Sequence, residues 1–250
     1  MMIFMIPATP GAGYDVRGYG EMFSLNGPAW SLFFEYIGNI IYALFIRRLS
    51  TKKLAYLTGL LALLHVWFFG GNVSEYNSVG VGWTLDTMNF FGGMLRMLFP
   101  FTMGMLLART FKPRKIKGAF WMCSAMLIAI FAVPYLGDAG KISQNSLYEV
   151  ACIAFVFPLI VWLGACGVVE NKATERINKF LGEISYPLYI IHYPVMYLFY
   201  MWLINNQYYG LKDTILAPAL VIMVSVAMAY AALKLYDEPV RRWLSKKLIK

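Results

Sequence analysis

Seven long apolar runs constrain the fold of this chain more than any other feature of its 250 residues. Each approaches or exceeds the roughly 20 residues that a helix needs to cross a hydrocarbon core about 30 Å thick. Because lipid offers no partner for backbone N–H and C=O groups, such runs must be helices. Only 14% of the residues are charged, against roughly 25% in a soluble protein. We predict an all-α, polytopic membrane helix bundle with transmembrane helices at about residues 29–46, 54–70, 92–108, 118–136, 147–169, 180–204 and 213–235.

Basic residues orient these helices. Four alternate connections, at residues 47–53, 109–117, 170–179 and 237–250, hold 17 of the 22 lysines and arginines. An excess of lysine and arginine marks the cytoplasmic side, so we predict an N-terminus outside the cell and a cytoplasmic C-terminus. Loops that face an anionic lipid surface account for the net charge of +9, so we expect the lipid bilayer, and no nucleic acid, as a partner.

The start of the chain raises a separate expectation. An external N-terminus normally needs an upstream helix or signal, but residues 1–6 (MMIFMI) are too short to span and carry no basic leader. We interpret them as the last turns of an interrupted helix. The sequence therefore predicts one membrane domain over residues 1–250 that is incomplete at its N-terminus, with an odd number of helices missing.

The three cysteines indicate packing. Cys123, Cys152 and Cys166 all fall in apolar spans, without the spacing of a disulfide framework or a zinc site. Cysteine is among the most buried residue types. The sequence also has no glycine-rich phosphate loop, and we expect no bound metal and no bound cofactor.

Polar residues inside the first span are the strongest candidates for function. Ser31, Glu35, Asn39 and Tyr42 repeat at a helical period and share one face. A carboxylate in hydrocarbon is costly, which favours a functional role. The alternative is a polar stripe that holds neighbouring helices together.

Two further groups lie in the outer parts of other spans. Arg96 falls at a depth similar to that of Glu35, so a Glu35–Arg96 ion pair is the structural alternative to a binding role. His65 is equally consistent with an interface histidine and with a site residue.

His192 lies near the middle of its span. Ser185, Tyr189 and His192 follow a helical period there, between Pro187 and Pro194. Two prolines predict a kinked or broken helix, which membranes tolerate where the helix lines a cavity. The imidazole could act as an acid or base, or only hydrogen-bond a neighbouring helix.

Four stretches carry a resemblance to a known family. NGPAWSLFFEY resembles the WSL-x-x-E signature of acyltransferase family 3, the membrane O-acyltransferases. RMLFPFTMGMLLA resembles the family's Phe/Gly-rich helix, LGEISYPLYIIHYPV its "LGKISYSLYLWHWPV" segment, and YDEPVRRWLSKKL its closing Glu-Pro-basic tail. The resemblance runs from about residue 22 to residue 247, with Glu183 standing where a lysine is common.

This resemblance implies an enzyme of the bacterial cytoplasmic membrane. It would transfer an acyl group, usually acetyl, from a cytoplasmic acyl-CoA-type donor to a hydroxyl of a cell-surface or exported glycan. Family members have about ten transmembrane helices and a first-helix arginine followed by a histidine regarded as the catalytic base. That histidine has no counterpart here, which agrees with the loss of about three upstream helices and leaves open whether this chain alone is active.

The resemblance also suggests roles for the polar residues. Glu35 would orient the missing imidazole or bind the acceptor hydroxyl, and His192 is the remaining histidine at mid-depth. The residues expected to bind substrate are Trp30 and Ser31 at the outer mouth, with Asn39, Arg96 and Tyr189.

The basic loop at residues 109–117 could attract the phosphates of the donor, although its cytoplasmic position alone explains its charge. Two other classes remain open. A transporter or flippase would also carry charged groups at mid-depth, although we find no internal repeat, and a non-catalytic protein would use Glu35 and Arg96 only for packing.

Overall fold

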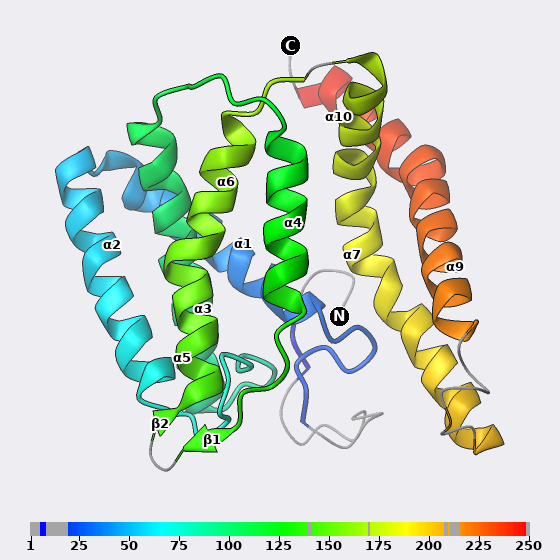
Figure 1. The fold of residues 1–250 in the computed structure, drawn as a ribbon, viewed down its shortest axis with the longest axis horizontal. Helices are drawn as coiled ribbons and strands as arrows, with labels where there is room; N and C mark the ends of the chain where they lie inside the picture. The colour runs from blue at the N-terminus through cyan, green and yellow to red at the C-terminus, as the bar shows by residue number, and fades with distance from the viewer. Residues whose placement is uncertain are drawn as a thin grey trace. The chain divides into compact units, whose positions relative to one another are not determined.

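The computed structural model describes residues 6–8, 20–139, 142–169, 171–207, 210 and 216–248. The chain divides into two units, which are described separately (Figure 1). The first unit contains Met1–Ser24 and Trp30–Val169, and the second contains Leu25–Ala29 and Glu170–Lys250.

The described residues are mainly helical, which confirms the predicted all-α membrane fold. Within the described residues, five helical stretches are long and apolar enough to cross a membrane, namely Thr51–Gly70, Thr87–Thr110, Gln144–Ala165, Lys172–Asn206 and Ala217–Lys247. The other two predicted spans are helical but shorter. α1 (Ala29–Leu44) has 16 residues and α4 (Ala119–Phe131) has 13, so they extend about 24 and 20 Å.

The first unit contains most of the elements. After α1 come a 3₁₀ turn η2 (Ile46–Arg48), α2 (Thr51–His65), a π-helical turn η3 (Val66–Gly70), α3 (Thr87–Thr110) and α4. Two short antiparallel strands then precede the last helices; the remaining elements are β1 (Asp138–Ala139), β2 (Ile142–Ser143), α5 (Gln144–Ala151), the π-helical turn η4 (Cys152–Val156) and α6 (Phe157–Ala165).

Polar caps define where these helices begin. The Ser50 hydroxyl accepts a hydrogen bond from the Lys53 N–H at 3.3 Å, and the Asp86 carboxylate accepts one from the Asn89 N–H at 3.0 Å. The first N–H groups of a helix have no partner within it, so these side chains stabilise the starts of α2 and α3.

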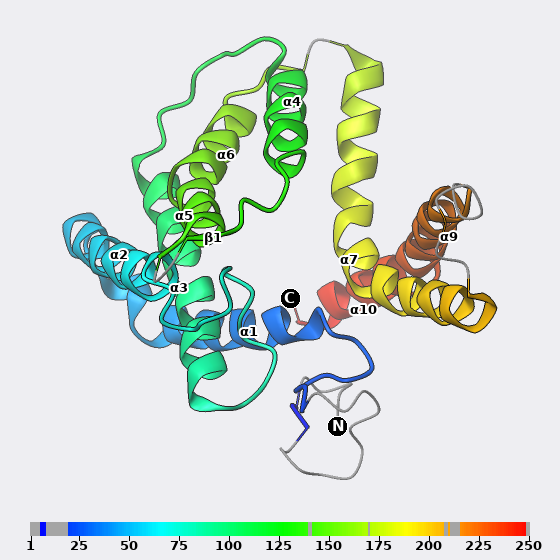
Figure 2. The same ribbon diagram turned by 60° about the horizontal axis from the view of Figure 1, so that its bottom comes forward.

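Two consecutive glycines let α3 approach its neighbours closely. A Cβ atom on Gly93 would lie 2.4 Å from the Phe34 ring of α1, and one on Gly92 would lie 2.3 Å from Val81. Figure 2 shows α1 crossing α3 in this unit. The buried apolar core beside this contact contains Leu61, Phe68, Phe69, Val81, Leu95, Phe99 and Val150.

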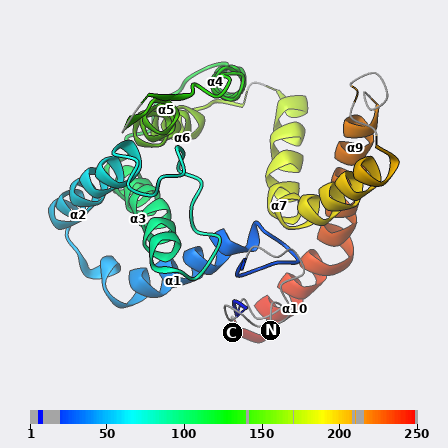
Figure 3. The same cartoon turned by 90° about the horizontal axis from the view of Figure 1, so that it is seen from below.

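The second unit is a helical hairpin with an added helix. α7 (Lys172–Asn206) packs along α9 (Ala217–Ala232), which continues through the π-helical turn η5 (Leu233–Asp237) into α10 (Glu238–Leu248) (Figure 1). α7 changes direction near its middle (Figure 3), as expected for a helix that contains Pro187 and Pro194.

Pro194 also explains a contact with the segment Leu25–Ala29. Proline has no N–H, so the Ile190 carbonyl four residues earlier loses its helical donor. The Asn26 side-chain amide donates to that carbonyl at 3.0 Å. This contact gives the carbonyl freed by Pro194 a new donor.

All three cysteines are free thiols, with Cys152 and Cys166 buried and Cys123 half-buried. Among the described residues, no cluster of histidine, cysteine and acidic side chains could hold a metal ion.

Candidate functional site

The predicted site residues fall into two polar regions, one in each unit. In the first unit, the Arg96 guanidinium donates a hydrogen bond to the Val81 carbonyl at 2.7 Å. The same guanidinium lies 4.5 Å from the centre of the Trp30 ring, in cation–π contact. The structure therefore brings Trp30 and Arg96 together, as parts of one packed contact.

A loop between η3 and α3 encloses this contact. The Asn89 side-chain oxygen accepts hydrogen bonds from the N–H groups of Gly82, at 2.9 Å, and Trp83, at 3.4 Å. Gly82 has a φ of +111°, and a Cβ atom there would lie 2.8 Å from Trp30. The sequence analysis did not predict a role for Asn89; its only signal in the sequence is an asparagine three residues after the acidic helix cap Asp86.

Asp86 connects that loop to α3. Its carboxylate accepts a hydrogen bond from the Asn89 side-chain amide at 2.8 Å and one from the Thr84 hydroxyl. Partial burial acts to raise the pKa of Asp86, but the hydrogen bonds from Thr84 and Asn89 outweigh it and hold that pKa below its ordinary value.

The Glu35–Arg96 ion pair, which the sequence left open as the alternative to a binding role, does not form. The ion pairs between described residues all lie in the second unit, and none involves Glu35. Successive residues of a helix point about 100° apart. Phe34 and Trp30 share the face of α1 that packs toward Arg96, which leaves Glu35 on an exposed face.

The rest of the predicted polar stripe follows Glu35. Asn39 is exposed, and its amide donates to the Glu35 backbone carbonyl at 2.9 Å. Ser31 is half-buried, and Tyr42 is 39% exposed. The stripe therefore exists as one helix face, but most of it is not covered by the described residues.

His65 takes the interface position that the sequence left open. Its ring is fully buried, with ring centres 4.6 Å from Phe69 and 5.1 Å from Phe99. Neither ring nitrogen has a hydrogen-bond partner among the described residues.

In the second unit, His192 lines a cavity of about 540 Å³ between α7 and α9. The walls are mostly apolar, and the polar groups are few. The lining consists of Ser185, Leu188, Tyr189, His192, Met196, Val221, Ile222, Ser225 and Val226. The structure thus brings together the predicted Ser185, Tyr189 and His192 and adds Ser225, a lone serine in an apolar helix that the sequence analysis overlooked.

The hydrogen bond of His192 indicates its tautomer. Nδ1 lies 3.0 Å from the Leu188 carbonyl oxygen, which can only accept. Nδ1 therefore carries the hydrogen, and in the neutral imidazole Nε2 is left as the basic nitrogen. The arrangement can bind a hydroxyl and accept its proton.

Tyr189 supports the cavity from one side. Its hydroxyl donates to the Pro28 carbonyl at 3.0 Å, and its ring centre lies 6.0 Å from that of His192. Together with the Asn26 contact, this hydrogen bond joins the segment Leu25–Ala29 to α7.

The basic loop at residues 109–117 is held by its first arginine. The Arg109 guanidinium donates to the Leu49 carbonyl at 2.6 Å, and the Arg114 guanidinium lies 5.7 Å from the Trp162 ring centre. These contacts place the loop against the first unit, and its suggested role toward the donor stays a prediction.

Comparison with known proteins gives one finding. A family model described as an acyltransferase domain matches residues 2–234. No curated protein and no solved structure matches the chain.

Proposed function

Because the chain belongs to acyltransferase family 3, we propose that it is a membrane O-acyltransferase. It moves an acyl group, in the simplest case acetyl, from a cytoplasmic acyl-CoA-type donor to a hydroxyl of a cell-surface or exported glycan. The protein is located in the bacterial cytoplasmic membrane. The observation that carries the proposal is the family match, which covers most of the chain.

The α7–α9 cavity supports this function chemically. O-acyl transfer needs a base for the acceptor hydroxyl and hydrogen-bond donors for the tetrahedral oxyanion. His192 has an available Nε2, and the Ser225 hydroxyl lies in the same mostly apolar cavity. Apolar walls favour an acyl group and strengthen hydrogen bonds to the oxyanion.

The reaction proceeds by addition and elimination. The acceptor oxygen attacks the thioester carbonyl carbon while His192 Nε2 takes its proton. Collapse of the oxyanion breaks the C–S bond, and the departing thiolate takes the proton from the imidazolium. The products are the acylated acceptor and the free thiol, and the imidazole returns to its neutral form.

A separate proposal concerns the polar face of α1, within the first unit alone. The exposed Glu35 and Asn39 and the half-buried Ser31 hydrogen-bond hydroxyl groups of a sugar there, because a carboxylate and two neutral polar side chains match a sugar. Trp30 and Arg96 position that face through their packed contact, and Tyr189 positions His192.

A transfer assay tests the proposal. The chain is purified in nanodiscs and incubated with acetyl-CoA labelled in the acetyl group and a bacterial polysaccharide carrying free hydroxyls. We expect label on the polysaccharide and release of free thiol in equal amounts. Reactions without the polysaccharide are the control.

Two results would count against an enzyme. One is the absence of both label transfer and thiol release across a panel of acyl-CoA donors and acceptors. The other is movement of labelled substrate into vesicles without any acceptor, which would instead favour the transporter class.

A further inference from the structure

A basic hollow in the second unit lies apart from the His192 cavity. It has a volume of about 760 Å³, at the end of α7 that faces η5 and α10. Five basic side chains line it against two carboxylates, and a third carboxylate, that of Asp237 in the adjoining hollow, pairs with Arg241, so the excess is two positive charges. The lining is Lys179, Glu183, Lys234, Glu238, Arg241, Arg242, Ser245 and Lys246.

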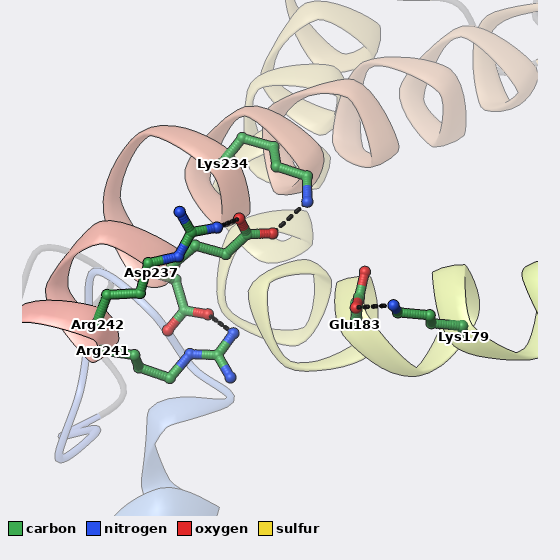
Figure 4. Close-up of polar contacts among 7 residues, drawn as sticks. Lys179, Glu183, Lys234, Asp237, Arg241 and Arg242 are labelled. Carbon is green, nitrogen blue, oxygen red and sulfur yellow. Dashed lines mark hydrogen bonds and ion pairs between the residues drawn. The ribbon is translucent and has the colours of Figure 1, made fainter. Parts of the chain in front are cut away.

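The ion pairs in this hollow are all local. Lys179 pairs with Glu183 on α7 at 3.9 Å, and Arg242 pairs with Glu238 on α10 at 2.9 Å. Each ion pair here joins residues four apart on one helical stretch. Among the described residues, no carboxylate therefore forms an ion pair across the hollow from α7 to α10 (Figure 4).

Glu238 illustrates the shortage of negative charge. Its carboxylate accepts hydrogen bonds from both Lys234 and Arg242, so one anion serves two cations. Lys246 also lines the hollow and has no carboxylate partner among the described residues. Cations that converge from two helices repel each other unless an anion lies between them.

These pairs are easily exchanged. The side chains of Lys179, Arg241 and Arg242 are 75%, 63% and 76% exposed, and exposed ion pairs contribute little to stability. Arginine forms stronger, two-pronged hydrogen bonds with a phosphate group. A bound phosphate group can therefore take the place of the carboxylates as the partner of these cations, with little loss of protein stability.

From this arrangement we propose that the hollow binds a phosphate group, held between Lys179 of α7 and Arg241, Arg242 and Lys246 of α10. The predicted cytoplasmic position of this end gives two sources for such a group, a soluble phosphorylated molecule and the headgroup of an anionic lipid. Lys234 lies in the π-helical turn η5 and Glu238 is the first residue of α10, and π-turns are frequent at functional sites.

The general enrichment of lysine and arginine on the cytoplasmic side of a membrane protein does not account for this arrangement. The rule for cytoplasmic loops predicts basic residues on one side of the membrane, without any preferred grouping. Here residues separated by more than fifty positions in the sequence line one hollow, and three of them are also part of an adjoining hollow of about 620 Å³. The shared residues are Lys179, Glu183 and Arg241.

Direct binding tests the proposal without any turnover. The full chain is placed in phosphatidylcholine nanodiscs and titrated with radiolabelled inorganic pyrophosphate. In a second arm, the chain is extracted from membranes containing phosphatidylglycerol, and native mass spectrometry counts the lipid that it retains. The double variant Arg241→Gln/Arg242→Gln is compared with Arg47→Gln/Arg48→Gln, which removes the same charge from the turn after α1.

We expect the Arg241/Arg242 variant to bind at least about tenfold more weakly in one arm, since charged hydrogen bonds to phosphate are lost. Loss of pyrophosphate binding identifies a soluble ligand, and loss of retained phosphatidylglycerol identifies a headgroup. Lys246→Gln, which removes a side chain that makes no ion pair with a described residue, should weaken the same arm if the double variant does not fold.

The proposal is overturned if the wild-type chain binds neither probe. It is also overturned if Arg47→Gln/Arg48→Gln weakens binding as much as the Arg241/Arg242 variant does, because the effect is then general charge. Neither result bears on acyl transfer, which is measured separately.

Discussion

Arg96 and His192 are both ionisable residues in membrane-length helices, yet the structure uses them differently. Arg96 is engaged by the Val81 carbonyl and the Trp30 ring, inside a contact closed by the Asn89 loop. His192 uses one nitrogen on its own helix and lines a cavity with the other available. The cost of a polar group in lipid marks both as candidates, and their surroundings show how the fold engages each one.

The largest expected effect is the loss of acyl-transfer rate when His192 is replaced. His192→Ala should lower the acyl-transfer rate by about 10²- to 10⁴-fold, the usual contribution of a positioned base. The thermal unfolding midpoint should change little, because the ring's hydrogen bond is to its own helix. Tyr200→Phe, an exposed change on α7, is the matched control. An unchanged rate in His192→Ala would remove this residue from the reaction.

The next effect is a packing test in the first unit. Gly93→Val should destabilise the protein by about 1–3 kcal/mol, because its side chain would overlap the Phe34 ring. Gly104→Val is the control, since a Cβ atom there meets nothing within 4 Å. Chemical denaturation in detergent gives the difference, and equal losses in both variants would contradict the close approach of α1 and α3.

Arg96→Gln tests the engaged arginine. We expect a loss of about 1.5–3 kcal/mol in stability, since a charge-assisted hydrogen bond and a cation–π contact disappear. Arg96→Lys should recover only part of it, because lysine lacks the planar guanidinium. If Arg96→Gln lowered the acyl-transfer rate with no change in stability, Arg96 would have a role in the reaction, as proposed for His192.

The Asp86 cap offers a test by pH. Its folded pKa is lowered, so the stability that it contributes is present above the unfolded pKa, near 4, and is lost as the pH falls through the folded pKa. Asp86→Ala should cost about 1 kcal/mol at neutral pH and less in acid. A constant difference between wild type and variant across that pH range would show that the carboxylate is not the cap.

Glu35→Gln should have the smallest effect on stability, within about 0.5 kcal/mol, because its carboxylate is exposed and makes no ion pair with the described residues. Its effect on transfer is a separate question. A raised KM for the acceptor would place α1 in acceptor binding, whereas an unchanged KM would leave its polar face without that role.

The predictable part of this molecule is set by local chemistry. The apolar runs predicted each described helical stretch that is long enough to span a membrane. Pro187 and Pro194 predicted the bend of α7. The buried face of α1 was harder to predict. The helix has an aromatic face with Trp30 and Phe34 and a polar face with Ser31 and Glu35, and the sequence does not say which of them packs against the neighbouring helix. Its packing depends on Gly93 and on the Asn89 loop, which are distant in sequence. The hollow around Glu238 likewise depends on the packing of α7 against α9 and η5, which no local pattern specifies.

The most direct measurement is the tautomer of His192 by nitrogen NMR. The chain has only two histidines, so ¹⁵N-histidine labelling gives two ring systems, and His65→Phe assigns them. In the neutral form of the His192 ring, we expect the hydrogen on Nδ1 and a bare Nε2 whose signal shifts when acceptor is added. A hydrogen on Nε2, or no response to any acceptor, would contradict the assignment of His192 as the proton acceptor.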